Sequence, residues 1–218
     1  MIAGHGRQGS RRPGCHSPVA GLPSTQGADM SEHPDPLRLF ARQALRTALV
    51  PAWFEALDLK EGDTVVDLGC GAGYVSLRAA TAVGNAGTVH AVDSNTEAVA
   101  FLEDLAKLHG LDQIRCHVQS IPELVPLSER PRGALLTMVL HHLPEPAAAL
   151  AHLAEALHGA PILIAEFDAT GPCRVGPGRE MRVSRSGVEA AIEEAGLVAH
   201  GFQQQTEEHW FVLASAPE

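Results

Sequence analysis

The sequence predicts an α/β domain whose central sheet is mostly parallel, with an antiparallel last strand. From about residue 36 onward, short runs of β-branched and other apolar residues alternate with helical segments, which is the pattern of βαβ units. The first such run leads through a glycine-rich turn into a helix, as a buried parallel strand commonly does. The last two expected strands are joined only by residues 205–208, a connection too short for a parallel crossover.

Helical periodicity begins at Pro36, after which apolar residues recur at spacings of three and four until Pro51 interrupts them, and the pattern then resumes to residue 58. Asn95 is expected to cap a later helix and Gly110 to end it. The expected strands cover residues 64–68, 88–92, 114–118, 134–140, 161–166, 197–204 and 209–214. The expected helices cover residues 36–58, 74–83, 95–109, 146–158 and 186–195, with a weaker helical pattern at 121–129.

Residues 1–29 differ in composition from the rest of the chain. They are rich in Gly, Pro and Ser, contain no aromatic residue and show no periodicity, so they lack the apolar surface that would offset their ordering entropy. We expect a disordered tail or a mis-assigned start before Met30, followed by one folded domain over residues 30–218. A translation-start artefact and a genuine flexible arm both remain open for this segment.

The charge of the chain and the spacing of its cysteines argue against several classes of partner and against a metal site. The chain has 16 Lys and Arg against 26 Asp and Glu, a net charge of −10, and no basic run with interleaved aromatic residues, which argues against nucleic acid. No apolar stretch approaches the roughly 18 residues that a membrane span needs, so no membrane partner is expected. The four cysteines form no C-x-x-C pair, which favours a reducing, cytoplasmic location and predicts no metal site.

The first candidate site is the segment Asp67–Gly73, where the first expected strand gives way to a helix. Glycines allow a sharp turn and let a ligand approach the backbone, and here they follow a G-x-G-x-G spacing. Tyr74 occupies the place of the third glycine of a dinucleotide fingerprint. Asp67 would repel a pyrophosphate and attract a cationic ligand. A plain strand-to-helix connection is the alternative interpretation of this turn.

The second candidate site is Asp93, which closes the next expected strand. Because the carboxyl ends of parallel strands meet at one edge of a sheet, Asp93 should lie near the glycine turn. A carboxylate in this place can accept hydrogen bonds from both hydroxyls of a ribose. The alternative role for Asp93 is to cap the following helix, and the nearby glycine turn favours the ribose.

Together, the segments Val65–Gly73 and Val89–Asp93 resemble the class I S-adenosylmethionine-dependent methyltransferases. The segment Leu140–Pro144, with the sequence Leu-His-His-Leu-Pro, is similar to one found after the fourth strand of small-molecule members. The resemblance extends over residues 36–214. It implies a doubly wound, mostly parallel seven-stranded sheet with an antiparallel last strand, the Rossmann-like methyltransferase fold.

The resemblance also implies S-adenosylmethionine as the cofactor. Gln119 stands where the family usually has an acid that contacts the adenine, and its amide carbonyl can accept the same hydrogen bond. The resemblance implies that Asp67, Gly69, Gly71 and Gly73 surround the methionyl part, that Asp93 binds the ribose and that Gln119 and Ser120 lie at the adenine. Cys70 and Ser94 are further expected cofactor-binding residues.

The implied reaction is the transfer of a methyl group to an oxygen, nitrogen or carbon atom of a small molecule. Because a sulfonium methyl is already activated, the protein mainly has to align the acceptor with it. A base assists a hydroxyl, carbon-acid or ammonium acceptor, and His141 and Glu166 are the candidates, with His142 and Asp168 beside them. The alternative is that the histidines only shape the loop and that Glu166 is a solvated turn residue.

Residues 168–181 contain many Gly and Pro residues and are expected to cover the pocket together with the helical segment at 36–58. This region is loosely similar to the substrate loop of relatives of ubiquinone and menaquinone C-methyltransferases. Two other functions remain open. One is a non-catalytic S-adenosylmethionine-binding regulatory or partner subunit, and the other is a nicotinamide-dependent oxidoreductase, which the residue at Tyr74 disfavours.

Overall fold

The computed structural model describes Met1 and residues 35–217, so the prediction for residues 1–29 lies outside the described residues except at Met1. The helices are α1 (Pro36–Ala44), α2 (Val50–Ala56), α3 (Tyr74–Val83), α4 (Thr96–His109), α5 (Pro146–Ala156) and α6 (Arg185–Glu194), with the short 3₁₀ turns η1 (Ile121–Glu123), η2 (Leu140–His142) and η3 (Arg179–Met181). The strands are β1 (Thr64–Leu68), β2 (Thr88–Asp93), β3 (Ile114–Val118), β4 (Gly133–Thr137), β5 (Ile162–Phe167), β6 (Val198–Thr206) and β7 (His209–Ser215).

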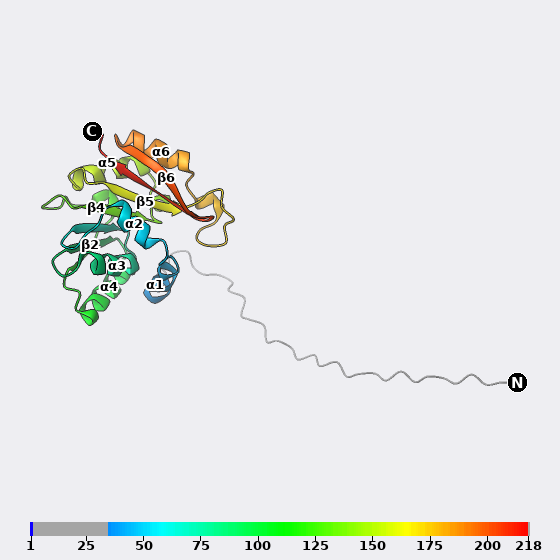
Figure 1. Cartoon of the computed structure of the whole chain (residues 1–218), viewed down its shortest axis with the longest axis horizontal. Helices are drawn as coiled ribbons and strands as arrows, with labels where there is room; N and C mark the ends of the chain where they lie inside the picture. Colours follow the sequence, from blue (N-terminus) through cyan, green and yellow to red (C-terminus); the bar gives the residue numbers. More distant parts are fainter. Residues whose placement is uncertain (2–34, 218) are drawn as a thin grey trace. The chain divides into compact units, whose positions relative to one another are not determined.

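Within the described residues the strands form one seven-stranded sheet in the order β3-β2-β1-β4-β5-β7-β6. The first five strands along the chain pair in parallel, whereas β7 lies antiparallel to both β5 and β6. Figure 1 shows α5 and α6 near the end of the sheet that holds β6, and α3 and α4 near β2. The predicted fold class, including its antiparallel last strand, is confirmed.

Alternate residues of the central strands serve two separate hydrophobic cores. Val66 of β1 and Leu136 of β4 pack with α5 and α6 on one face, whereas Val65 and Leu135 pack with α2 and α3 on the other. Because successive strand side chains point to opposite faces, a strand covered on both faces is mostly apolar. This explains the mainly apolar sequences of β1, β4 and β5, whose buried charged residues are the exceptions Asp67 and Glu166.

Three expected elements differ from the structure. The helix expected at 36–58 is two helices, because the chain turns at residues 45–49 and Pro51 lies in the first turn of α2, where its missing N–H is harmless. The helix expected at 121–129 is reduced to the single turn η1. Strand β4 ends at Thr137 because Met138 has a φ of 58°, which is incompatible with an extended chain.

The boundaries of α4 agree with the capping residues in the sequence. The side chain of Asn95 accepts hydrogen bonds from the backbone N–H groups of Glu97 and Ala98, each at 3.1 Å. Gly110 ends the helix in a left-handed conformation with a φ of 63°. Asp93, the last residue of β2, therefore lies two residues before the N-cap of α4.

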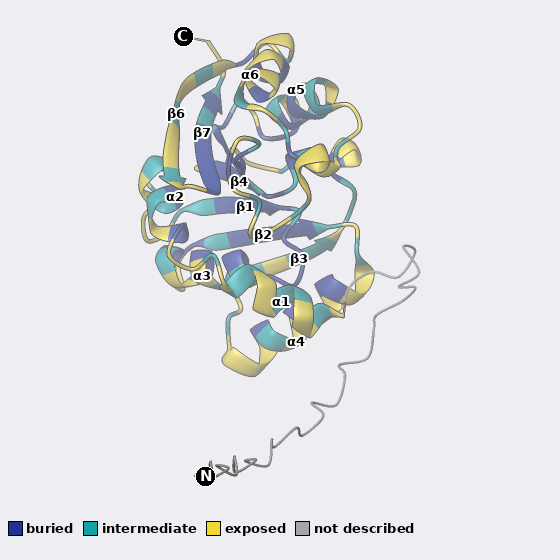
Figure 2. Cartoon of the chain, turned by 90° about the vertical axis from the view of Figure 1, so that its right-hand side faces the viewer, coloured by how far each residue is buried: buried dark blue, intermediate teal, exposed yellow. Residues whose placement is uncertain are grey.

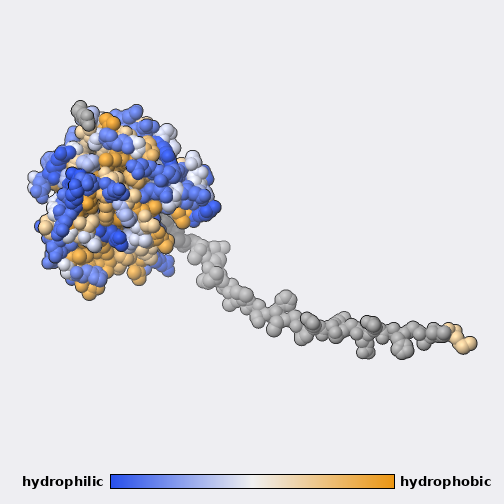
Figure 3. All heavy atoms as spheres, viewed as in Figure 1, coloured by the Kyte–Doolittle hydropathy of each residue, from blue (hydrophilic) through white to orange (hydrophobic). Residues whose placement is uncertain are grey.

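Burial is unevenly distributed over the helices. Helix α1 has no buried residue, whereas β1 and β4 are each buried at every position but one, as the colours of Figure 2 show for β1. Figure 3 shows polar and hydrophobic side chains mixed over the visible face, with hydrophobic atoms gathered in its lower half. Helix α1 therefore rests on the domain by partly exposed contacts, without forming part of either core.

Candidate functional site

The glycine turn after β1 is shaped by three left-handed glycines. Gly69, Gly71 and Gly73 have φ values of 69°, 53° and 86°, a backbone region that disfavours other residues. The N–H groups of Gly69 and Cys70 both donate to the carbonyl of Val92, at 2.8 and 3.0 Å, which ties the turn to β2. The predicted strand-turn-helix geometry of this segment is therefore present.

Asp93 is bound directly to the glycine turn. Its Oδ2 atom accepts a hydrogen bond from the backbone N–H of Gly71 at 2.7 Å, and its Oδ1 atom accepts one from the N–H of Asn95 at 2.8 Å. Each carboxylate oxygen has a second lone pair, so these two bonds orient the group without saturating it. The two motifs that the sequence analysis singled out thus form one structure.

Asp67 is buried in β1 beneath the turn. Its Oδ2 atom accepts a hydrogen bond from the Ser76 hydroxyl at 2.6 Å, and only 1% of the residue is exposed. Burial raises the pKa of Asp67 to about 7, against the opposing effect of the Ser76 hydrogen bond. The sequence analysis missed Ser76, although a serine on the buried face of α3 is a detectable signal of an internal hydrogen bond.

Gln43 of α1 is a second residue that the sequence analysis missed. Its amide Nε2 donates to the carbonyl of Cys70 at 2.8 Å, and its Oε1 accepts a longer hydrogen bond, 3.4 Å, from the N–H of Tyr74. A Cβ atom added to Gly71 would lie 2.7 Å from Gln43 Nε2, so this side chain covers the turn. Burial raises the pKa of the Cys70 thiol.

The residues predicted to contact an adenine line a groove beyond β2 and β3. The groove has a volume of about 230 Å³ and is lined by Ser94, Val118, Gln119, Ser120 and Glu123. The N–H of Gln119 donates to the backbone carbonyl of Asp93 at 3.0 Å, so the groove adjoins the second motif. A larger groove of about 350 Å³ adjoins Asp58 and Arg132, next to the first residue of β4, away from these residues.

His141 and Glu166 form a buried pair at the carboxyl ends of β4 and β5. His141 Nδ1 lies 2.8 Å from Glu166 Oε2 and 3.0 Å from Oε1, and the two side chains are 3% and 0% exposed. The carboxylate also accepts the N–H groups of His141 and Phe167, each at 3.2 Å. An ionised carboxylate only accepts, so Nδ1 carries the proton of a neutral ring and the lone pair is on Nε2.

Phe167 follows Glu166 and is surrounded by cationic and imidazole groups. The guanidinium carbons of Arg46 and Arg182 lie 5.7 and 5.3 Å from the centre of its ring. The His209 ring is centred 5.1 Å away and the His141 ring 6.0 Å away. Arg46 comes from the turn between α1 and α2, and nothing in the sequence pattern indicated that it reaches β5.

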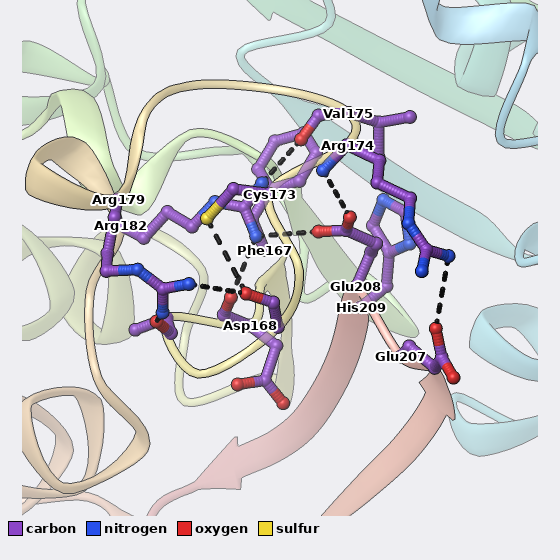
Figure 4. Close-up of polar contacts among 12 residues, drawn as sticks. Phe167, Asp168, Cys173, Arg174, Val175, Arg179, Arg182, Glu207, Glu208 and His209 are labelled. Atoms are coloured by element: carbon purple, nitrogen blue, oxygen red, sulfur yellow. Dashed lines mark hydrogen bonds and ion pairs between the residues drawn. The ribbon is translucent and has the colours of Figure 1, made fainter.

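The segment after β5 is anchored to the turn between β6 and β7, as Figure 4 shows. The fully buried Arg182 side chain bonds Glu208 Oε2 and the Asp168 carbonyl, both at 2.8 Å, and the Pro177 carbonyl at 3.1 Å. Hydrogen bonds from Thr170 lower the pKa of Asp168 to about 2, although burial acts in the opposite direction. Arg182 therefore holds the loop that the sequence predicted to be a cover.

The two candidate halves adjoin each other at neighbouring strands. Val139, just after β4, packs so close to the glycine turn that a Cβ on Gly69 would lie 2.5 Å from its Cγ2 atom. On one side of the turn lie Asp93, which bonds the Gly71 N–H, and the groove lined by Ser94, Gln119 and Ser120. On the other side lies the buried pair of His141, just after β4, and Glu166, in β5. No group of three or more metal-binding side chains occurs within the described part of the chain.

Residues 59–212 match the family model described as a methyltransferase domain. The chain belongs to the methyltransferase domain family. This match confirms the predicted resemblance to S-adenosylmethionine-dependent methyltransferases and, with it, the predicted enzyme class and cofactor. No helix in residues 35–217 of this methyltransferase combines the length and the hydrophobicity of a membrane span.

Solved structures share the fold of this methyltransferase at low sequence identity. A SAM dependent methyltransferase from Aquifex aeolicus has a TM-score of 0.74 at 23% identity, covering 84% of this chain and 99% of that one. Magnesium protoporphyrin IX methyltransferase from Synechocystis PCC 6803, crystallised with bound SAM, has a TM-score of 0.59 at 20% identity, covering 84% and 82%.

A curated relative of this methyltransferase matches over a shorter segment. The protein named "Probable cobalt-precorrin-6B C(15)-methyltransferase (decarboxylating)", from Saccharolobus solfataricus, is 36% identical over 55 residues. The match covers 25% of this chain and 28% of the relative. The chain therefore matches little more than a quarter of that relative's length.

Proposed function

We propose that this methyltransferase transfers a methyl group from S-adenosylmethionine to a small molecule. The observation that carries the proposal is the hydrogen bond between Asp93 and Gly71, which joins a left-handed glycine turn to an acid at the next strand end. Asp93 would bind the ribose, because both its oxygens are oriented by backbone N–H groups and keep free lone pairs. Ser94, Gln119 and Ser120 would border the adenine in the adjoining groove.

The glycine turn would hold the methionyl part. The Cys70 carbonyl faces Gln43 and has a second lone pair that can accept from an ammonium group. Asp67 would act from beneath the turn, where its bond to Ser76 connects β1 with α3. The cofactor supplies an activated methyl group when bound, so the remaining requirements are alignment of the acceptor and removal of its proton.

His141 would remove that proton. The Glu166 carboxylate fixes the proton of the neutral ring on Nδ1, which leaves the Nε2 lone pair as the base and stabilises the imidazolium that forms on proton transfer. Glu166 would therefore act through His141 as a positioning residue. This arrangement suits a hydroxyl, an ammonium or a carbon acid as the acceptor.

Calorimetry with S-adenosylmethionine and a labelled-methyl assay test the proposal together. We expect saturable cofactor binding, and transfer of label from methyl-labelled S-adenosylmethionine into a small-molecule fraction of a cell extract. Binding without transfer would instead support the non-catalytic subunit. A thermal shift with a nicotinamide cofactor and none with S-adenosylmethionine would overturn the assignment.

A further inference from the structure

The segment that contains α1 and the start of α2 is positively charged within an acidic protein. Residues 36–54 contain three arginines and no Asp or Glu, although the whole chain has a net charge of −10. Arg38 and Arg42 are spaced by four residues, which places them on neighbouring turns of one face of α1, and Arg46 lies in the turn that follows this helix. A local charge of this sign favours an anionic ligand when it adjoins a binding site.

Arg46 brings this charge to the candidate base. Its guanidinium lies over the ring of Phe167, the residue that follows Glu166. Burial and the neighbouring Arg42 lower the pKa of Arg46 to about 10, whereas Glu166 acts in the opposite direction. Arg46 is therefore still a cation at pH 7. It lies close to Arg42, a second cation, and to the His141–Glu166 pair.

Within the described residues, no carboxylate forms an ion pair with Arg46. Arg46 makes no side-chain hydrogen bond or ion pair there, and neither does Arg42. Glu166, the nearby acid, already accepts hydrogen bonds from His141 and Phe167. By contrast, Arg182, on the same Phe167 ring, is paired with Glu208. A partly buried guanidinium without an anion is unfavourable unless a ligand supplies one.

His209 offers a second polar group beside the same ring. Its Nε2 atom is buried and has no hydrogen-bond partner among the described residues. The Thr206 hydroxyl accepts from the N–H of Glu208 and can donate its proton to His209 Nδ1, 2.9 Å away, which places the ring proton on Nε2. Burial and the charge of Arg46 lower the pKa of His209 to about 4, so the ring is a neutral donor at pH 7.

We propose that the methyl acceptor carries an anionic group, a carboxylate or a phosphate, which Arg46 binds with support from Arg42 and the Nε2 donor of His209. This inference rests on the proposed function and deepens it, because it names the chemical class of the acceptor. Guanidinium groups bind carboxylates and phosphates through two parallel hydrogen bonds, which also orients the bound molecule. The reacting atom would then face His141, across the Phe167 ring.

The cofactor also has a carboxylate, on its methionyl part. The glycine turn that would hold this part follows β1, whereas Phe167, beneath Arg46, ends β5, with β4 between them in the sheet. The position of Arg46 thus favours the acceptor as the source of the anion. Saturating the protein with S-adenosylhomocysteine separates the two sources, because the cofactor site is then filled.

Calorimetry on the full chain, saturated with S-adenosylhomocysteine, tests the inference with three probes: benzoate, its neutral isostere benzamide, and inorganic phosphate. We expect the wild type to prefer benzoate over benzamide by about tenfold or more, the scale of one charge-assisted contact. Arg46→Gln should abolish this preference, and Arg46→Lys should retain part of it. Arg38→Gln is the matched control, since Arg38 is exposed on the preceding helix α1 and should keep the preference.

The following outcomes would contradict the inference or the proposed function. If neither benzoate nor phosphate binds the wild type better than benzamide does, or if Arg38→Gln loses the preference as fully as Arg46→Gln, the inference is wrong. If Arg46→Gln instead weakens S-adenosylhomocysteine binding about tenfold, the anion belongs to the cofactor and the acceptor assignment fails. If the wild type does not bind S-adenosylhomocysteine at all, the proposed function itself fails. Failure of the inference alone looks different, because S-adenosylhomocysteine then binds and only the preference for the anion is missing. If Arg46→Gln does not fold, Arg42→Gln provides the test, with a smaller expected loss of the preference for benzoate over benzamide.

Discussion

The two halves of the candidate site are built in different ways. The half that includes Asp93 and the glycine turn comes from two strand ends that are consecutive along the chain, and the hydrogen bonds that join them are all donated by backbone N–H groups. The half around Phe167 combines β4, β5, the start of β7 and the turn before α2. A cofactor common to a family can be bound by a local motif, whereas an acceptor is selected by side chains that only the tertiary structure brings together.

Glu166→Gln should have the largest effect and would sharpen this comparison. The amide retains the size of the buried side chain but removes the charge that orients His141, so we expect the methyl-transfer rate to fall about 10²–10⁴-fold. Cofactor affinity should stay within about twofold of wild type, because the change affects the acceptor half alone. The matched control is Glu207→Gln, an exposed residue, and an equal loss of rate in both variants would contradict the assignment.

Arg182→Met tests whether the loop after β5 depends on its buried cation. Removing one partner leaves Glu208 unpaired, so the free energy of unfolding should drop by about 3–5 kcal/mol in urea titrations. Arg174→Met removes an exposed pair with Glu207 and should lower it by less than about 1 kcal/mol. A similar loss of unfolding free energy in both variants would mean that the buried ion pair contributes no more to stability than the exposed one.

Asp67→Asn tests the cofactor half through its pH dependence. The fold raises the pKa of Asp67 to about 7, so its neutral form is favoured, and this stabilisation is complete below about pH 4 and is lost as the pH rises through 7. The asparagine imitates the neutral form at every pH. The stability of wild type relative to the variant should therefore fall by about 2–3 kcal/mol between pH 5 and pH 8. Asp112→Asn, on the surface, should show no such change.

Asp93→Ala should have the smallest effect of the four. It removes the acceptor of two backbone N–H groups and of the expected ribose hydroxyls, so cofactor affinity should weaken by about 1–3 kcal/mol in calorimetry. Glu97→Ala, an exposed change in the first turn of α4, serves as the control. Unchanged cofactor binding in Asp93→Ala would show that Asp93 does not bind the ribose, and its assignment to the cofactor site would be wrong.

The sequence predicts the sheet well because its signals are local. Asn95 and Gly110 delimit α4 by capping chemistry that needs no tertiary contact, and the apolar strand runs follow from burial on both faces. The predicted end of β4 at residue 140 is wrong, because a methionine side chain gives no indication that the backbone of Met138 is left-handed.

The candidate site is only partly accessible from sequence. Asp93 and the glycine turn could be identified by spacing, and Ser76 by its polarity on an apolar helical face. Gln43 and Arg46 could not, because their contacts depend on where α1 docks against α3 and on where the turn after α1 lies over β5. Pairing of His141 with Glu166 likewise requires β4 and β5 to be neighbours, which the order of strands along the chain does not state.

Helix α1 lies outside the region that the family match covers, which begins at residue 59. It nevertheless provides Gln43 to the glycine turn, and the turn that follows it provides Arg46 to Phe167. Since α1 contributes no residue to the hydrophobic cores, substitutions along it cost little stability. Residues 36–46 could therefore be exchanged, and Gln43 and Arg46 with them, without altering either hydrophobic core.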